Sequence, residues 1–252
     1  MPGGEILVGV HAVLEALRAG QPVNKILVAR QSRRQEVEEI IRLAREGGIP
    51  VQMVPPEHVK RLSAGVPTQG VVAVASPKRY VSLDEIMQVA RRQGEPALLV
   101  ALDQVEDPQN LGAILRNAEA AGAHGVIIPA RRSALATAAV AKASAGALAH
   151  VPLARVTNLA RALDELREKG LVVVGLSAEA DTVLYSLSLL NPLVLVVGGE
   201  DRGLRRLVRE KCDWLASLPL RGRVNSLNAA AAAAVALYEV LRQRHHARQN
   251  SP

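Results

Sequence analysis

Apolar residues in the second half of the chain fall into short continuous runs separated by helical patterns. The run 96–103 precedes a helical segment over 107–122, and a second apolar run follows at 125–129. Neither run alternates with polar residues, which is typical of strands buried on both faces of a parallel sheet. The pattern predicts a βαβ unit over residues 97–129. Ligands of such sheets bind beyond the carboxyl ends of the strands.

The helical segment carries its own start and stop signals. Asp107 or Asn110 can cap its first turn, and Gly122 stands where a left-handed residue would end it. Asn110 and Arg116 are polar residues on an otherwise small and apolar helix. Because they follow a predicted strand directly, we expect them near a functional site.

The whole chain divides into three parts. Residues 1–76 alternate helical and strand patterns, which predicts a small α/β domain. Residues 77–96 are polar with one weak helix at 83–91, which indicates a linker. Residues 97–252 predict a larger α/β domain with an open parallel sheet. The expected elements are helices at 11–19, 35–46, 57–62, 134–148, 159–169, 204–211 and 227–243, and strands at 25–29, 51–54, 70–75, 171–176, 193–197 and 214–218.

Composition restricts the functional classes. Lys or Arg interrupts every long apolar run, so the sequence predicts no membrane span. The first residues lack the basic stretch and apolar core of a signal peptide, and Cys212 is the only cysteine. We therefore expect a cytoplasmic protein without an internal disulfide. The six histidines form no cluster at ligand spacing, so no metal site is predicted.

Charge and aromatic content bear on the partner. The formal net charge of +7 suits a polyanionic partner, although a basic excess is also common in proteins that never bind nucleic acid. Aromatic residues make up 2% of the chain, which argues against modules that stack bases on aromatic platforms. No Gly-x-Gly-x-x-Gly follows the first strand of either domain, which argues against a nicotinamide enzyme.

Two further loops at predicted strand ends carry polar residues. In the first, the paired Gly198 and Gly199 let backbone groups approach a ligand, although glycine turns after strands are common in purely structural roles. In the second, Ser226 or Asn228 can cap the last helix. The alanine run 229–234 then permits close packing of another backbone or of a partner subunit.

Together the three loops resemble the signature motifs of the SpoU-type (SPOUT-class) RNA ribose 2′-O-methyltransferases. Segment 107–116, Asp-Pro-Gln-Asn-Leu-Gly-Ala-Ile-Leu-Arg, is similar to the first motif, and segment 198–203, Gly-Gly-Glu-Asp-Arg-Gly, to the second. Segment 219–228, which ends in Ser-Leu-Asn, is similar to the third. In the second motif Gly199 and Asp201 stand where the family usually has Ser or Ala and then Gly. Glycine removes bulk there, so we interpret this departure as tolerated.

The resemblance implies a fold, a cofactor and a substrate. The family fold is an open parallel sheet with a C-terminal trefoil knot. Residues 9–17 resemble the small ribosomal-protein-like α/β domain that binds RNA in the subgroup methylating a guanosine ribose of 23S rRNA. The resemblance therefore implies an RNA substrate-binding domain at 1–76 and a methyltransferase domain at 97–252. The implied cofactor is S-adenosyl-L-methionine, bound by Gly198, Gly199, Leu218, Leu227 and Asn228, without metal.

The resemblance also implies the catalytic residues. These are Arg116, Asn110, Glu200, Ser226 and Asn228. An arginine essentially never loses its proton in proteins, so we interpret Arg116 as a charged anchor rather than as the base. In this interpretation Arg116 binds a phosphate and stabilises the developing alkoxide, Asn110 orients Arg116, and Glu200 lies near the hydroxyl.

Partners follow from the last helix and from the basic residues. The helix over 227–243 is apolar around much of its circumference, which indicates burial within the monomer or, as family resemblance implies, a homodimer in which both subunits form each site. The large-subunit rRNA is the expected RNA partner. Phosphate contacts are expected from Arg33, Arg34, Lys60, Arg61, Lys78 and Arg79, although any of these could equally be solvated surface.

Two other functions remain open at this point. A tRNA ribose 2′-O-methyltransferase, or a resistance-type rRNA methyltransferase, would carry the same three loops. A non-catalytic RNA-binding ribosome-assembly factor would share the charge and the N-terminal domain but would not need all three loops intact. The N-terminal domain favours housekeeping modification of 23S rRNA.

Overall fold

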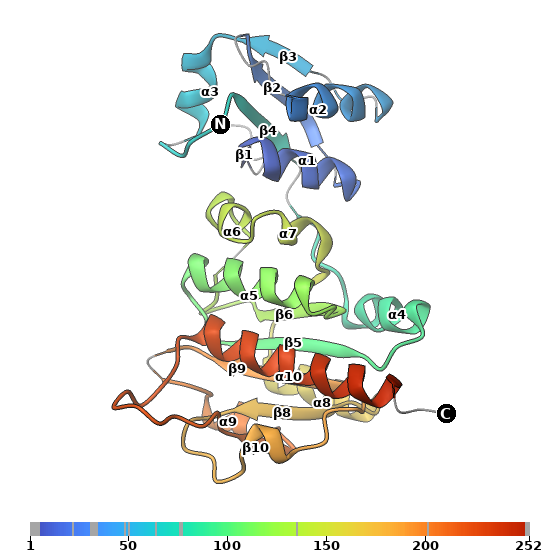
Figure 1. Cartoon of the computed structure of the whole chain (residues 1–252), viewed down its shortest axis with the longest axis vertical. Coiled ribbons are helices and arrows are strands. Elements are labelled where there is room, and N and C mark those ends of the chain that lie inside the picture. Colours follow the sequence, from blue (N-terminus) through green and yellow to red (C-terminus); the bar gives the residue numbers. More distant parts are fainter. Residues whose placement is uncertain are drawn as a thin grey trace. The chain divides into compact units, whose positions relative to one another are not determined.

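The structure is a computed structural model (Figure 1). It describes residues 6–21, 23–30, 35–47, 49, 51–63, 65–75, 78–134, 136–200 and 202–249. The chain divides into two compact units, described separately below. The first unit comprises Met1–Arg79 and Leu135–His150, and the second comprises Tyr80–Ala134 and Val151–Pro252.

The first unit contains a four-stranded mixed sheet with strand order β1-β4-β2-β3. β4 is antiparallel to β1 and β2, whereas β2 and β3 are parallel. The amphipathic pattern of α2 buries one face against the domain core, and α1 packs on α2. The strands are β1 (Ile6–Val8), β2 (Val23–Ala29), β3 (Val51–Val54) and β4 (Val71–Ala75), and the helices are α1 (Val10–Arg18), α2 (Gln35–Glu46) and α3 (Pro56–Leu62). β1 is an element that the sequence pattern did not predict.

The helix expected at 134–148 is two short helices instead. α6 (Ala138–Ala143) and α7 (Ala147–His150) are separated by a turn in which Ala145 and Gly146 have φ of 47° and 99°. This segment belongs to the first unit, where α6 contacts β1 and α7 contacts α1. A Cβ on Gly146 would lie 2.7 Å from Cγ of Glu15, so glycine permits the close approach. The sequence pattern predicted one helix because Ser144, Ala145 and Gly146 are as small as the residues on either side of them.

The second unit contains a six-stranded sheet in the order β10-β8-β9-β5-β6-β7, in which every pair is parallel. This confirms the parallel sheet expected from the unbroken apolar runs. The strands are β5 (Leu98–Asp103), β6 (Gly125–Pro129), β7 (Leu153–Val156), β8 (Val172–Leu176), β9 (Leu193–Gly198) and β10 (Trp214–Ala216). β7 was not predicted from the sequence.

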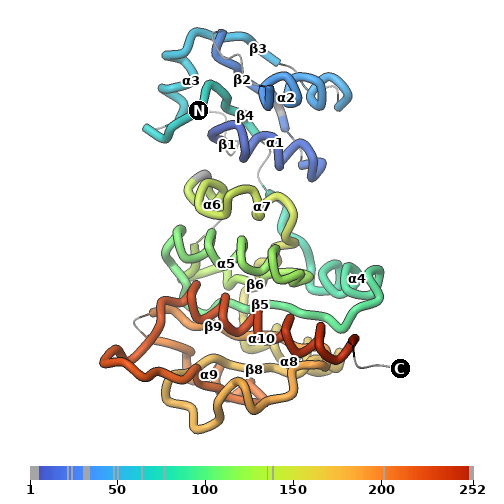
Figure 2. The backbone as a smooth tube through the Cα atoms, viewed as in Figure 1, coloured from blue at the N-terminus to red at the C-terminus, as the bar shows by residue number. Residues whose placement is uncertain are grey.

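Helices cover both faces of this sheet. Side chains of α4 (Leu83–Gln93), α8 (Leu159–Glu168) and α9 (Arg206–Arg209) share one core cluster with alternate residues of the central strands, including Leu99, Ala101, Val194 and Val196. α5 (Pro108–Ala120) and α10 (Ala229–Gln249) lie side by side and cover the other face through β6 and β9 (Figures 1 and 2). The remaining described helical element is the 3-10 turn η1 (Leu184–Ser186).

The expected linker 77–96 is corrected by the packing of α4. Ser82 caps this helix in a reciprocal capping box with Glu85, and Leu83, Ile86 and Met87 are buried in the core of the second unit. Val81 also pairs with the sheet through Ala154. The unit boundary therefore lies between Arg79 and Tyr80, and most of the expected tether is structural. The polar face of α4 explains why the sequence pattern predicted a linker here.

The strand order places the change of direction at β5 and β9. From β5 the chain moves outward to β6 and β7, whereas β9 lies on the other side of β5 next to β8. Loops after β5 and β9 therefore leave the same edge of the sheet as neighbours, which is where open α/β sheets bind ligands. No helix in the described part of the chain is long and apolar enough to cross a membrane.

Candidate functional site

The first turn of α5 releases the side chain of Asn110 for function. Asp107, rather than Asn110, is the N-cap, because its Oδ1 accepts a hydrogen bond from the amide of Gln109 at 3.0 Å. Pro108 occupies the first helical turn. This resolves the alternative left open by the sequence, and Asn110 is free to reach the neighbouring loops.

Three of the expected site residues converge in one polar cluster. Asn110 Nδ2 donates to Glu200 Oε1 at 2.9 Å, and Asn228 Nδ2 donates to Asn110 Oδ1 at 2.8 Å. Asn228 Nδ2 also contacts Glu200 Oε1. The cluster joins residues from all three loops, and two amide groups direct their N–H groups at one carboxylate.

Asn228 is held in place by the helix that follows it. Its Oδ1 accepts hydrogen bonds from the amides of Ala230 and Ala231 at 3.0 and 3.1 Å. Asn228 is therefore the residue that caps α10, and Ser226 is not. The cap fixes the amide orientation, so that Nδ2 must point toward Asn110 and Glu200.

Steric contacts explain why positions 198 and 199 are both glycine. A Cβ on Gly198 would lie 2.4 Å from the carbonyl carbon of Gly203, and one on Gly199 would lie 2.4 Å from the carbonyl oxygen of Gln104. Both contacts are with backbone, which cannot move aside cheaply. Gly199 also donates to the Asp103 carbonyl at 2.9 Å. The family's usual Ser or Ala at the place of Gly199 would not fit this loop, while Asp201 lies outside the described residues.

A buried ion pair anchors the same loop, and the sequence analysis missed it. Asp103 at the end of β5 is fully buried, and its Oδ1 accepts from Arg205 Nε at 2.7 Å and pairs with Arg205 Nη2 at 2.6 Å. Its Oδ2 accepts from the Arg205 amide at 2.7 Å. These three contacts satisfy a charge that would be costly if left unpaired. The sequence signal for this ion pair is a carboxylate at the end of an otherwise apolar strand.

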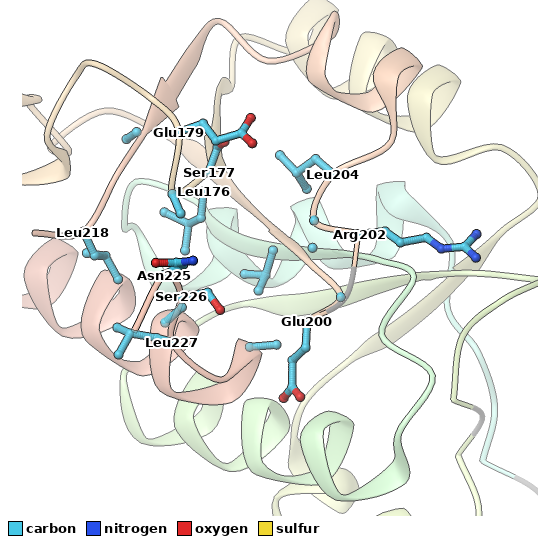
Figure 3. Close-up of a pocket in the computed structure, with 18 of the residues that line it drawn as sticks. Leu176, Ser177, Glu179, Glu200, Arg202, Leu204, Leu218, Asn225, Ser226 and Leu227 are labelled. Atoms are coloured by element: carbon cyan, nitrogen blue, oxygen red, sulfur yellow. The ribbon is translucent and has the colours of Figure 1, made fainter. Parts of the chain in front are cut away.

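A cavity of about 420 Å³ opens beside the polar cluster (Figure 3). Its lining comes from the ends of β8, β9 and β10 and from the segment before α10. It includes six expected residues: Gly198, Gly199, Glu200, Leu218, Ser226 and Leu227. Ser177 and Glu179 also line it and were missed, because the loop after β8 carries no motif. Apolar leucines and a few polar groups together suit an amphipathic small molecule.

A second cavity of about 550 Å³ lies on the other side of Glu200. Asn110, Asp107, Glu106, Gln104 and Arg132 contribute polar side chains to it. Gly199, Glu200, Arg202 and Ala229 line both cavities. The carboxylate of Glu200 therefore stands where two separate ligands could meet, one in each cavity.

Arg116 is not brought into this cluster within one chain. It lies six residues after Asn110 on α5, which places it about 120° around the helix from Asn110. Arg116 is exposed, and in the described residues it makes no hydrogen bond or ion pair. Within one chain Asn110 binds Glu200 and not Arg116. The orientation of Arg116 by Asn110 therefore stays a prediction.

The basic residues expected to contact RNA are only partly described. Arg33 and Arg34 lie outside the described residues. Lys60 and Arg61 are exposed on α3. Lys78 donates to the carbonyl of Leu148, so its ammonium group is engaged within the first unit.

Metal and thiol chemistry have little support in the described residues. No group of three or more His, Cys, Asp or Glu side chains among them could hold a metal ion. Burial raises the pKa of the Cys212 thiol to about 12, so it is protonated at neutral pH and is a poor nucleophile.

Family models match nearly the whole chain. The model of the SpoU rRNA methylase family matches residues 97–238, and that of the RNA 2′-O ribose methyltransferase substrate-binding domain matches residues 6–81. Two similar proteins are assigned to the TrmH family of tRNA/rRNA methyltransferases. One, from Staphylococcus haemolyticus, is 44% identical and covers 98% of both chains. The other, YacO of Bacillus subtilis, is 43% identical and covers 96% of both.

Solved structures agree with this relationship. The SpoU methyltransferase AviRb from Streptomyces viridochromogenes, in complex with its cofactor AdoMet, has a TM-score of 0.83 at 29% identity and covers 96% of this chain and 90% of its own. The AdoMet-bound rRNA methyltransferase of Sinorhizobium meliloti has a TM-score of 0.81 at 27% identity, covering 95% and 87%. The A. aeolicus TrmH/SpoU tRNA-modifying enzyme has a TM-score of 0.56 at 26% identity and covers 66% of this chain and 85% of its own.

These findings identify a methyltransferase with an α/β parallel-sheet fold. The chain belongs to the SpoU rRNA methylase family, and it is therefore an S-adenosylmethionine-dependent RNA methyltransferase.

Proposed function

We propose that the protein transfers a methyl group from S-adenosylmethionine to the ribose 2′-hydroxyl of a guanosine in 23S rRNA. The carrying observation is the cluster of Asn110, Glu200 and Asn228 between two cavities. The first cavity fits the cofactor, because Gly198 and Gly199 leave backbone exposed beside the leucines Leu218 and Leu227. The second fits the nucleotide that presents its hydroxyl.

In this reaction the chain's own residues would align the hydroxyl, favour its deprotonation and stabilise the alkoxide. When bound, S-adenosylmethionine supplies an electrophilic methyl group, so the protein needs mainly to align the hydroxyl and favour its deprotonation. Glu200 is placed to accept a hydrogen bond from the hydroxyl, and Asn110 and Asn228 hold its carboxylate. Ser226 lines the cofactor side. Arg116 would bind a phosphate and stabilise the alkoxide as a charged anchor.

The N-terminal unit supports an rRNA substrate over a tRNA. The substrate-binding model matches residues 6–81, and the AviRb and S. meliloti structures cover both units of this chain. The A. aeolicus tRNA-modifying enzyme covers only 66% of this chain. An enzyme acting on ribosomal RNA would work in the cytoplasm.

We also infer a homodimer through α10. Its buried face includes Ala233, Leu237 and Val240, yet Val235, Tyr238 and Leu241 on its outer face are 38%, 50% and 40% exposed. These three recur at helical spacing and form an apolar stripe without a partner in the described chain. A two-fold partner would cover the stripe and would bring a second Arg116 to the site. The family's trefoil knot is proposed as well, supported by the return of α10 onto α5 and β9.

The function is tested with labelled S-adenosylmethionine. Purified protein should label rRNA from a strain that lacks the gene, should not label tRNA, and should do so in the presence of a chelator. Reverse transcription at limiting nucleotides should then stop at one guanosine of the 23S rRNA. Labelling of tRNA alone would replace rRNA by tRNA as the substrate, and binding of rRNA without labelling would favour the assembly factor.

A further inference from the structure

A groove in the second unit lies next to the second cavity and is lined by four arginines. Its volume is about 580 Å³, and it is formed by the end of β6, the first turn of α8 and the segment that enters α9. The arginines are Arg131, Arg132, Arg205 and Arg206. No motif in the sequence singles out this groove.

The groove is continuous with the catalytic region. Arg132 lines both the groove and the second cavity, where Asn110 and Glu200 also lie. A strand whose ribose enters the second cavity would therefore pass Arg132 and continue into the groove.

Two of the four arginines have no ion-pair partner among the described residues. Arg205 is bound by the buried Asp103 through Nε and Nη2, and Arg206 pairs with Glu210 at 2.6 Å. Arg131 and Arg132 are exposed, and neither makes an ion pair or hydrogen bond with a described residue. Their guanidinium groups are free for an anionic ligand, and a planar guanidinium binds phosphate oxygens in pairs.

Backbone conformation supplies an independent observation. Arg132 has φ of 56° and Gln104 has φ of 61°, and they are the two non-glycine residues with positive φ in the described part of the second unit. Both line the second cavity. Such residues cost free energy and occur at sites where the conformation serves a function.

The first turn of α8 adds hydrogen-bond donors to the same groove. Leu159 and Ala160 line it, and their amides precede the first helical bond, which runs from Ala162 N to the Asn158 carbonyl at 3.1 Å. The amides of a first turn have no acceptor inside the helix, and a phosphate is well suited to them.

We propose that this groove binds the backbone phosphate next to the target nucleotide of the RNA, through Arg131 and Arg132 and the first turn of α8. This inference rests on the proposed function, and it adds a phosphate-binding site for the RNA strand next to the target ribose. Phosphate contacts carry no sequence information, so the groove sets the register of the ribose at Glu200 rather than the choice of RNA. The occupant is an RNA phosphodiester, because the groove joins the nucleotide cavity and not the cofactor cavity.

The test uses the full-length protein with in vitro-transcribed large-subunit rRNA. The double variant Arg131→Gln, Arg132→Asn should raise KM for the RNA by about tenfold, as expected from losing charge-assisted hydrogen bonds. The slope of log affinity against log salt should fall by about 1, as expected from one lost phosphate contact. Affinity for S-adenosylmethionine should stay unchanged. The control is Arg92→Gln on α4, which removes one positive charge at an exposed position. It should leave the salt slope of RNA binding unchanged.

A second variant separates binding from stability. Arg132→Asn places a residue that tolerates positive φ at the strained position, so its melting temperature should be equal to or above that of the wild type while its RNA affinity falls. An unchanged salt slope in the double variant would overturn the proposal, and so would a loss of S-adenosylmethionine affinity as large as the loss of RNA affinity. Failure of the wild type to methylate any RNA would instead overturn the proposed function.

Discussion

Asn228 shows how one side chain serves the helix and the site together. Its oxygen caps α10, and its nitrogen contacts Asn110 and Glu200. A capping residue is common before any helix, and the sequence alone could therefore not separate the two roles. The structure separates them because an amide has a donor and an acceptor end, and here each end has a different partner.

Glu200→Gln tests the carboxylate itself. Glutamine keeps the shape and can still accept from Asn110, but it loses the charge that assists loss of the hydroxyl proton. We expect kcat to fall by about 100-fold or more, with S-adenosylmethionine affinity near that of the wild type. Single-turnover methylation of rRNA is the measurement. Glu119→Gln, an exposed change on α5, is the control, and a Glu200→Gln enzyme with near-normal kcat would exclude Glu200 from the reaction.

Arg116→Lys separates the anchor from the base. Lysine keeps a cation but lacks the planar fork, so an anchor predicts a fall in kcat of about 100- to 1000-fold with the shape of the pH profile retained. If Arg116 were the base, the lower pKa of lysine would move the alkaline limb of the profile down by units. Single-turnover rates against pH for both proteins decide, and substantial recovery at high pH would restore the general-base role.

His124 gives a pH dependence of stability outside the site. Burial lowers the pKa of this imidazole below its ordinary value, and Nδ1 accepts from the amide of Leu98 at 3.0 Å. The unfolded chain therefore takes up a proton as pH falls below about 6.5, before the folded protein does. The free energy of unfolding contributed by neutral His124 is complete above that pH and is lost as pH falls toward the lowered pKa.

His124→Asn tests this sign. Asparagine can still accept from Leu98 but does not titrate, so the urea midpoint should fall less between pH 7 and pH 5 than in the wild type. His246→Gln, at an exposed position of α10, should keep the wild-type pH dependence. An equal decline in the asparagine variant would assign the loss to other groups.

At the scale of elements, the loop after β9 depends on Gly199, whereas the loop before α10 does not depend on Gly222. Gly199→Ala would place a Cβ against the Gln104 carbonyl, whereas a Cβ on Gly222 meets nothing within 4 Å. We expect Gly199→Ala to destabilise the second unit by about 1–3 kcal/mol through overpacking and to weaken S-adenosylmethionine binding. Gly222→Ala is the matched control and should change neither. Calorimetry of unfolding and of cofactor binding checks both, and equal behaviour of the two variants would contradict the steric account.

Periodicity predicted most elements and missed those whose signal is short or tertiary. The buried strands β5, β6, β8 and β9 were predicted because continuous apolar runs reflect burial on both faces. β1 and β7, of three and four residues, are too short for a period to show. The sequence predicted the helix α4 at 83–91 but placed it in a linker, because only packing reveals its apolar face as core.

The candidate site was predictable in part for the same reason. The three loops could be found by resemblance, and their convergence at Asn110, Glu200 and Asn228 follows from parallel strands ending at one edge. The Asp103–Arg205 ion pair and the strained Arg132 could not be found this way, since neither a pairing partner nor a dihedral angle is written in a single sequence.

At the scale of the whole molecule, the position of Arg116 raises the question of which subunit uses it. If it acts in the partner's site, a dimer of one Arg116→Ala subunit and one Glu200→Gln subunit has one site with both defects and one site intact. Random mixing of the two inactive variants should then restore about a quarter of wild-type activity. Methyl transfer after unfolding and co-refolding is the measurement. No recovery, with mixed dimers shown to be present, would place Arg116 in its own subunit's site.

The polar cluster also has a consequence for the timing of activity during synthesis. Its hydrogen bonds join residues 90 and 118 positions apart in the chain, and β9 must enter between β5 and β8 before they can form. Contacts of such long range form late and slowly in folding. Partly made or partly folded chains can thus hold a folded first unit but no assembled reaction centre. The enzyme can therefore catalyse methyl transfer only after nearly all of its sequence has been translated and folded.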